Sequence, residues 1–181
     1  MNIEFKLAYS ILLLYAAFLI KKTYSYIKLR EFYISNIKRL KQGIIKVEDL
    51  HELTPTEFEH WCGSFLDKEG FYNIYVTPDS LDGEKDIICK KSNEIYYVEC
   101  KKFILNQAVQ YQIDIEIVKQ LIGSMVSDNV TNGIIITSGI FTKEAINYIK
   151  TLPKLYKIIT YNGENLVTDY NTANNLLLCE Q

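Results

Sequence analysis

The sequence predicts an α/β sandwich preceded by a separate apolar helix. Segments with the two-residue alternation of strands are interleaved with segments of helical spacing, a pattern typical of this fold class. The hydrophobic content, 48% of all residues, is enough for one buried core, which we place at residues 47–170. The other predicted parts are a membrane anchor, a basic helical linker and a C-terminal tail, at residues 1–22, 23–46 and 171–181.

The anchor is predicted from residues 7–20, which carry no charge and lie between Lys6 and the pair Lys21 and Lys22. A helix of this length covers about 21 Å of a hydrocarbon core of about 30 Å, so spanning requires the flanking lysines to snorkel. A buried or oligomerising helix and a cleaved signal peptide are the alternatives. Because positive flanks stay inside, we expect a membrane-anchored protein whose folded domain faces the cytoplasm.

The first helix of the domain is predicted to begin after Thr54. Thr-Pro-Thr-Glu is a capping box with proline at the first helical position, so Glu57 most simply caps the helix. A buried stripe follows at helical spacing, formed by Phe58, Trp61, Cys62, Phe65 and Leu66. Glu59 lies at the edge of that stripe, where a solvated glutamate is the plainer alternative to a functional one.

A β-hairpin is predicted next, with strands at residues 86–90 and 95–101. A two-residue or a four-residue connection gives the same register, in which Asp86 faces Glu99 directly. Side chains alternate along a strand, so one face should be chemical and the other should belong to the core. Tyr97, Glu99 and Lys101 share the chemical face with Asp86, and Val98 and Cys100 share the core face with Ile87 and Cys89.

The two facing carboxylates repel each other unless a cation lies between them. Oxygen ligands of this kind suit Mg²⁺ or Mn²⁺, which makes Asp86 and Glu99 candidate metal ligands. Lys101 would point at the ion-bound water or at a phosphate, where it orients the nucleophile and balances charge. A solvated hairpin edge with an ordinary Glu-x-Lys pair is the alternative.

The rest of the domain is predicted from apolar runs and caps. A helix is expected at residues 107–127, with Gly123 allowing close approach to the sheet. A buried strand should follow at 133–137, then a helix capped by Thr142 and ending at Ile149. One more strand is expected at 155–160.

Six short motifs occur in the order expected of one family: LTPTEFE at 53–59, EGF at 69–71, DGEKDII at 82–88, VECK at 98–101, GIIIT at 133–137 and FTKEA at 141–145. Over residues 50–167 the chain resembles the Mrr-like restriction endonucleases, which are PD-(D/E)xK nucleases. The resemblance also extends to a closing turn and short helix at 161–166.

The resemblance implies a restriction-endonuclease-like fold, a mixed central sheet flanked by helices, and Mg²⁺-dependent hydrolysis of DNA. It implies that Asp86 and Glu99 bind the metal and that Lys101 is the catalytic lysine. It also suggests a catalytic glutamate on the first helix, for which Glu59 is the candidate, and it leaves Asp82 as a secondary candidate beside Asp86. Many relatives carry glutamine in place of Glu99, a difference that keeps the metal chemistry intact.

Charge is distributed unevenly along the chain. Residues 1–46 contain nine lysine or arginine residues and two glutamates, a net of +7, whereas residues 47–181 have a net charge of −9. An acidic domain should bind DNA weakly and with strong salt dependence unless its basic residues cluster. Those near the predicted site, and so the candidate DNA contacts, are Lys85, Lys90, Lys91 and Lys102. The basic linker adjoins the anchor and so fits anionic lipid better than DNA.

Other chemistries find little support in the sequence. The four cysteines lack metal-ligand spacing, and the only histidines are His51 and His60, which argues against a zinc site. No winged-helix or SRA-type reader is recognisable, so the sequence assigns no specificity, and the reading module is either absent or on another protein. A homodimer and a separate specificity protein are both candidate partners. We expect a membrane-tethered endonuclease for restriction or defence. A non-catalytic protein that binds nucleic acid or a partner is the alternative, and a junction-resolving or repair nuclease is the alternative among enzymes.

Overall fold

The computed structural model describes residues 12–24, 27, 44–78, 85–103 and 112–179, the last seven of these by their backbone alone. The chain divides into two compact units, residues 1–44 and 45–181. In the first unit residues 12–24 are helical, and their large apolar side chains, such as Leu14 and Phe18, are exposed. Within the described residues no helix has both the length and the apolar character needed to cross a membrane. Residues 7–11 of the predicted anchor, and residues 28–43 of the predicted linker, lie outside the described residues.

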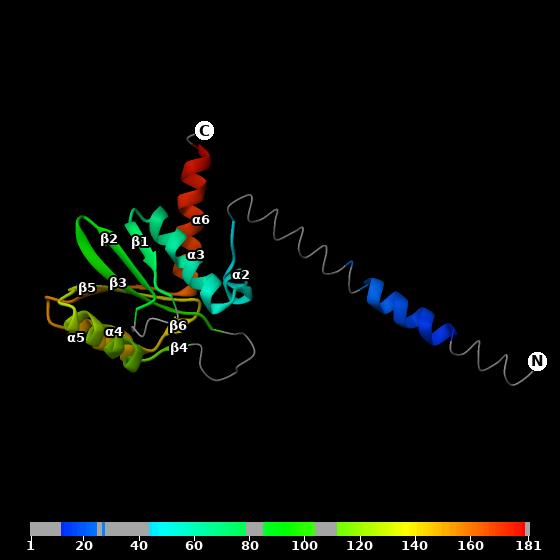
Figure 1. The fold of residues 1–181 in the computed structure, drawn as a ribbon, viewed down its shortest axis with the longest axis horizontal. Helices are drawn as coiled ribbons and strands as arrows, with labels where there is room; N and C mark the ends of the chain where they lie inside the picture. The colour runs from blue at the N-terminus through cyan, green and yellow to red at the C-terminus, as the bar shows by residue number, and fades with distance from the viewer. Residues whose placement is uncertain (1–11, 25–26, 28–43, 79–84, 104–111, 180–181) are drawn as a thin grey trace, which may run out of the picture. The chain divides into compact units, whose positions relative to one another are not determined.

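The second unit is built on a five-stranded mixed sheet, shown in Figure 1. The first three strands are antiparallel, and the third, fourth and fifth are parallel. In spatial order the strands are β1 (Tyr72–Val76), β2 (Ile87–Lys91), β3 (Glu94–Lys101), β5 (Asn132–Thr137) and β7 (Lys157–Tyr161). The expected mixed central sheet is therefore confirmed.

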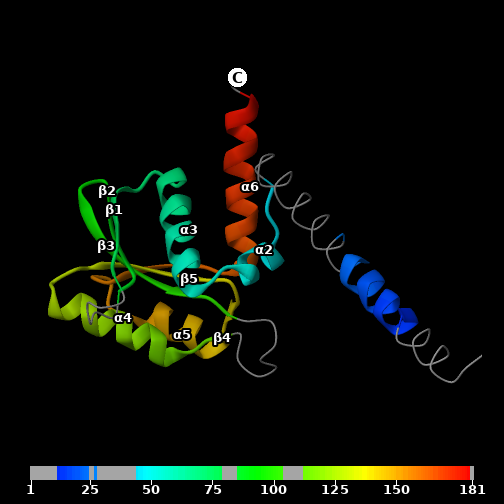
Figure 2. The same cartoon turned by 45° about the vertical axis from the view of Figure 1, so that its right-hand side comes forward.

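Helices cover both faces of this sheet, as Figure 2 shows from a second direction. One core joins the sheet to α2 (Val47–Glu52), α3 (Pro55–Lys68) and α6 (Gly163–Cys179). A second core joins the opposite face to α4 (Ile115–Ser127) and α5 (Lys143–Thr151). Two short strands, β4 (Gln112–Ile113) and β6 (Ile140–Phe141), pair in parallel beside this second layer.

The hairpin register inside the β2–β3 ladder is the predicted one, running from Ile87 opposite Val98 to Lys91 opposite Glu94. The connection has two residues, Ser92 and Asn93, with φ of 53° and 65°. Positive φ at both central positions matches the twist of the flanking strands, which is why this turn closes a tight hairpin. The predicted strand end at residue 90 was one residue short.

The pairing of Asp86 with Glu99 was wrong in detail, because Asp86 lies just before the ladder. Its backbone N–H donates to Val98 O at 2.8 Å, and its carbonyl accepts from Thr77 N at 2.8 Å. Both Asp86 and its neighbour Ile87 therefore stand opposite Val98. Such an irregularity redirects a side chain at the end of a ladder.

The predicted core face of the hairpin is confirmed, since Ile87, Cys89, Val98 and Cys100 are all buried in the first core. The prediction implied that the opposite face of the hairpin is open along its whole length, and this was wrong. Tyr97 is buried there in the second core, beneath α4, whose buried residues are Val118, Leu121 and Met125. Chemistry on this face is therefore confined to the carboxyl end of β3.

The helix α4 begins at Ile115, since residues 112–113 form β4 and not the predicted helix, and residues 107–111 lie outside the described residues. Asp114 caps it by accepting hydrogen bonds from Glu116 N and Ile117 N at 3.0 and 3.2 Å. The predicted role of Gly123 was also wrong, because a Cβ there would meet nothing within 4 Å. Close approach depends instead on Gly133 of β5, where a Cβ would lie 2.7 Å from Met125 Sδ.

The remaining local predictions are largely confirmed. Thr54 and Glu57 form the capping box of α3, with the Thr54 N–H donating to Glu57 Oε2 at 2.8 Å. Thr142 caps α5 by accepting from Ala145 N at 3.1 Å. α6 is longer than the predicted short helix and continues through the predicted tail to Cys179. α2, whose first turn is capped through Asp49, was not predicted.

Candidate active site

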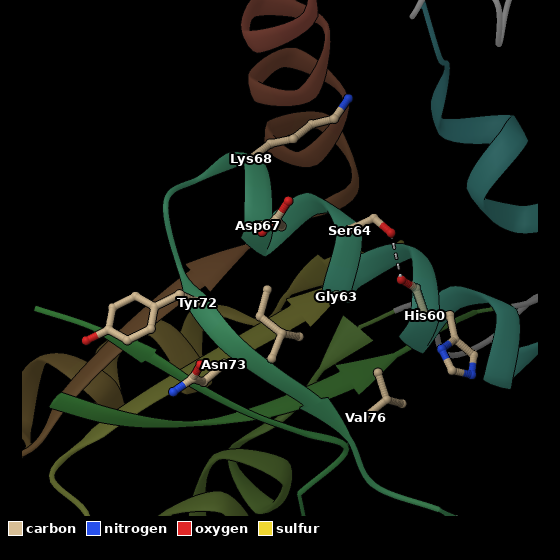
Figure 3. A pocket seen from close by; sticks show the side chains of 9 residues that line it. His60, Gly63, Ser64, Asp67, Lys68, Tyr72, Asn73 and Val76 are labelled. Carbon is tan, nitrogen blue, oxygen red and sulfur yellow. Dashed lines mark hydrogen bonds between the residues drawn. The ribbon is translucent and has the colours of Figure 1, made fainter. Parts of the chain in front are cut away.

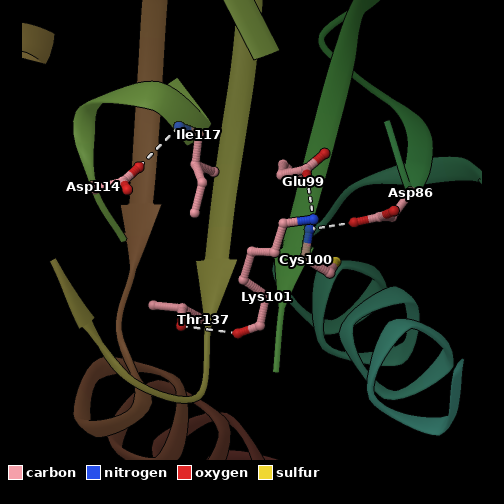
Figure 4. A network of polar contacts seen from close by, with 7 residues as sticks. All are labelled: Asp86, Glu99, Cys100, Lys101, Asp114, Ile117 and Thr137. Carbon is pink, nitrogen blue, oxygen red and sulfur yellow. Dashed lines mark hydrogen bonds and ion pairs between the residues drawn. The ribbon is translucent and has the colours of Figure 1, made fainter. Parts of the chain in front are cut away.

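Asp86 is fixed at the mouth of the hairpin by three hydrogen bonds. Besides its two backbone bonds, its carboxylate oxygen Oδ2 accepts from Cys100 N at 2.6 Å, as Figure 4 shows. Here a carboxylate oxygen takes the place of a backbone carbonyl as the acceptor. Hydrogen bonding between the two segments of the hairpin therefore continues beyond the last ladder pair. The Asp86 side chain is therefore held at the backbone of Cys100, the residue between Glu99 and Lys101.

Glu99 and Lys101 form an ion pair through Glu99 Oε1 and Lys101 Nζ. The Glu99 side chain is 7% exposed and the Lys101 side chain is 39% exposed, so the carboxylate is buried and the lysine lies at the surface. Burial acts to lower the pKa of Lys101, but attraction and hydrogen bonding to Glu99, followed by attraction to Asp86, outweigh it and raise that pKa. Lys101 is therefore an ammonium at neutral pH, in the field of both carboxylates.

The parallel partner strand fixes the backbone of this segment. Glu99 lies opposite Ile135 and Lys101 opposite Thr137, whose hydroxyl donates to Lys101 O at 2.9 Å. Figure 4 shows the start of α4, with Asp114 and Ile117, beside this end of the sheet. Parallel strands in α/β proteins bring their carboxyl ends to one edge, where ligands usually bind.

The donor set fits a hard divalent cation. Two carboxylates come from neighbouring segments, and Mg²⁺ typically takes one or two carboxylates and completes its coordination with water and phosphate. Among the described residues no group of three or more His, Cys, Asp or Glu side chains is arranged to hold a metal. The set therefore suits an ion whose coordination is completed by water and substrate better than a structural metal with an all-protein shell. The roles of Asp86, Glu99 and Lys101 as ligands and catalyst remain predictions.

Helix α3 packs against the same part of β3. Cys62 and Cys100 are buried in the same core, so the middle of α3 lies beside the Glu99 to Lys101 segment. Glu59, one turn earlier, is half-buried, and its catalytic role remains a prediction. Glu57 is occupied by the cap, and its hydrogen bonds to the Thr54 backbone and side chain lower its pKa.

The candidate DNA contacts differ in their surroundings. The Lys85 ammonium pairs with Asp128, and the Lys91 ammonium donates to Glu69 O at 2.7 Å above the ring of Phe71. Lys90 and Lys102 are half-buried. Asp82 lies outside the described residues. DNA binding by these lysines remains a prediction.

A groove of about 600 Å³ lies elsewhere, between α3 and the edge strand β1 (Figure 3). Its polar lining includes His60, Ser64, Asp67 and Asn73. None of the lining residues belongs to the carboxylate and lysine cluster, and Lys68 at its rim stands over the ring of Tyr170, 3.8 Å from its centroid.

Sequence reasoning missed the network of Lys85, Tyr97 and Asp128 beside the cluster. Tyr97 OH donates to Asp128 Oδ2 at 2.6 Å, and the Lys85 ammonium lies 4.1 Å from the centroid of the Tyr97 ring. These residues come from three separate segments, so no local spacing signals their contact. The only hint was the position of Lys85 directly before Asp86.

Comparison with known proteins identifies one family. The family model Mrr_cat, described as "Restriction endonuclease", matches residues 50–168. A search of curated proteins finds no match. Among solved structures, the DNA modification-dependent restriction endonuclease AspBHI has a TM-score of 0.53 at 16% identity, covering 74% of this chain and 37% of its own. MspJI, solved in complex with a 27-mer oligonucleotide, has a TM-score of 0.46 at 17% identity, covering 68% of this chain and 31% of its own. The chain thus spans about a third of the length of these two enzymes.

Proposed function

The chain belongs to the Mrr_cat restriction endonuclease family, and from that membership we propose that it is a Mg²⁺-dependent DNA endonuclease. The observation that carries the proposal is the cluster in which Asp86, Glu99 and Lys101 meet at the open end of the hairpin. Mn²⁺ should substitute for Mg²⁺, because the ligands would be carboxylate oxygens.

Asp86 and Glu99 would hold the ion. When bound, it stabilises charge on the phosphate oxygens and lowers the pKa of a coordinated water. The Asp86 carboxylate starts from a fixed position, held by the Cys100 amide. The Lys101 ammonium is held by its ion pair with Glu99. Its positive charge would balance the negative charge that develops on the scissile phosphate. Glu59 would approach the same region from α3.

The biological role that fits best is restriction or defence against incoming DNA. The net charge of −9 in residues 47–181 predicts weak and salt-sensitive binding to the DNA backbone. Lys90 and Lys102 would supply part of the contact. Selectivity for a sequence or a modification would come from a second copy of the chain or from a separate specificity protein.

Membrane tethering through residues 7–20 is part of the proposal. It is supported by the uncharged stretch, by the flanking Lys21 and Lys22, and by the exposure of apolar side chains in the helix at 12–24. The nuclease domain would then face the cytoplasm. A reporter fused after residue 30 should sediment with membranes and stay accessible only from the cytoplasmic side. A soluble reporter would exclude the anchor.

The central test is plasmid nicking by the full chain at low salt, with Mg²⁺ or Mn²⁺, on methylated and unmethylated DNA. Asp86→Asn and Lys101→Met should lose activity, whereas Lys119→Met, which breaks only the exposed Glu116 to Lys119 pair on α4, should keep it. Cleavage that is independent of metal, or that survives in both site variants, would refute the proposed site. A folded wild-type chain that cuts neither duplex nor branched DNA would favour a non-catalytic binding protein, which the acidic charge also suits.

A further inference from the structure

Three side chains from separate segments meet beside the proposed metal site. Lys85 precedes β2, Tyr97 lies in β3, and Asp128 is the C-cap residue of α4. The Lys85 ammonium and the Tyr97 hydroxyl both contact Asp128 Oδ2, the second at 2.6 Å. The same ammonium stands over the Tyr97 ring, so each member of the trio contacts the other two.

Two of the three side chains are largely buried, whereas Asp128, with its side chain 39% exposed, lies at the surface. Tyr97 is 7% exposed, and a buried hydroxyl needs a hydrogen-bond partner, which Asp128 supplies. The Lys85 side chain is 19% exposed, packed on an aromatic face and ion-paired at the same time. Hydrogen bonds from Lys85 and then from Tyr97 lower the pKa of Asp128, so the acceptor is a carboxylate at neutral pH.

Each member is close in sequence to a proposed metal ligand. Lys85 is covalently next to Asp86, and Tyr97 lies two residues before Glu99 on the same strand face. Asp86 lies outside the regular ladder and is held by its own bonds to Val98, Thr77 and Cys100, to which the contacts of the preceding residue are added. Anchoring the preceding residue to α4 and β3 would restrict where the Asp86 backbone, and therefore its carboxylate, can lie.

We propose that Lys85, Tyr97 and Asp128 are positioning residues that hold Asp86 and Glu99 in the geometry for binding the divalent cation. The inference rests on the proposed function for its effect on activity. This role requires no contact with the metal or with DNA, and it is separate from the predicted DNA contact of Lys85. Lys85 acts on Asp86 through the backbone that joins the two residues. Tyr97 acts on Glu99 through β3, which carries both.

The test compares Lys85→Met, Tyr97→Phe and Asp128→Asn with Lys119→Met in the full chain. The control breaks an exposed ion pair on the same helix, α4, but lies away from the trio. Partners of this kind typically contribute 10–100-fold to metal affinity or activity. We therefore expect the half-saturating Mg²⁺ concentration for cleavage to rise roughly 10-fold or more in the three variants, with KM for DNA unchanged in Tyr97→Phe and Asp128→Asn. Lys85→Met combined with Asp128→Asn should cost less than the sum of the two single variants, because both changes remove the same Lys85 to Asp128 ion pair.

A second measurement does not depend on nuclease activity. Exchange of the Cys100 amide proton, which reports the hydrogen bond to Asp86, should be at least about tenfold faster in Lys85→Met than in Lys119→Met. Equal Cys100 exchange and equal Mg²⁺ dependence in trio and control variants would overturn the inference while leaving the nuclease intact. A wild-type chain that neither binds Mg²⁺ nor cuts would refute the proposed function, and Cys100 exchange alone would then decide whether Lys85 positions Asp86.

Discussion

The Asp86 carboxylate accepts a hydrogen bond from the backbone N–H of Cys100 at 2.6 Å. This contact joins a residue that precedes β2 to the residue between Glu99 and Lys101 in β3. It orients one carboxylate oxygen of Asp86 toward the strand. The proposed ligands therefore share one rigid support.

Asp86→Asn should weaken Mg²⁺ binding strongly, because an amide keeps the shape of the side chain but lacks the charge that attracts a cation. An amide oxygen can still accept from Cys100 N, so the fold should survive. Isothermal titration should show a dissociation constant raised roughly 10-fold or more. Asp67→Asn, at an exposed position of α3, is the matched control. Equal Mg²⁺ affinity in both variants would contradict the proposed ligand role.

Glu99→Gln should lower the pKa of Lys101 in the metal-free protein. Burial lowers this pKa, and Glu99 is the principal group that raises it, so its removal leaves burial opposed only by weaker attractions such as that of Asp86. NMR titration of the Lys101 side chain measures the change directly. A lysine whose pKa is higher in the folded than in the unfolded protein stabilises the fold at pH values below its unfolded pKa. The wild type should therefore lose this stabilisation as the pH rises through the folded pKa of Lys101. An unchanged pKa would mean that the ion pair does not persist in solution.

Gly133→Ala should destabilise the domain by about 1–3 kcal/mol. The added Cβ would lie 2.7 Å from Met125 Sδ of α4 and 2.7 Å from Ile158 Cδ1 of the neighbouring strand β7. Gly123→Ala is the opposite case, since nothing lies within 4 Å of the added atom and the position is exposed on a helix. It should stabilise the domain by about 0.5–1 kcal/mol. Urea unfolding of both variants checks the pair, and a similar sign for the two would refute this packing.

The three buried cysteines, Cys62, Cys89 and Cys100, should resist modification by thiol reagents in the folded protein. Burial raises the pKa of Cys89 to about 12, and burial followed by the contact with Cys62 raises the pKa of Cys100. Little reactive thiolate of Cys89 or Cys100 therefore forms at neutral pH, and Cys62 is closed to reagents by its burial. In a Cys179→Ser background, an aromatic disulfide reagent should label Cys62, Cys89 and Cys100 only after denaturation. Rapid labelling without denaturant would show that the first core opens.

Local sequence determined the parts of this protein whose signals lie within a few residues. The capping box of Thr54 and Glu57, the N-cap at Thr142 and the tight hairpin turn all follow from short-range hydrogen bonding and backbone preference. The hairpin register followed because a connection of either two or four residues pairs the same positions. Together with the family motifs, these features were enough to predict the mixed sheet and to select Asp86, Glu99 and Lys101.

Only the tertiary structure decided how that cluster is supported. Asp86 leaves the ladder because its side chain, not its backbone, bonds the Cys100 amide. Tyr97 is buried because α4 packs over a face that strand alternation alone would leave open. Asp128 pairs with Lys85 across 43 positions of sequence, and Gly133, not Gly123, allows α4 to approach the sheet. Contacts between segments so far apart depend on how whole elements pack, and no local pattern encodes them.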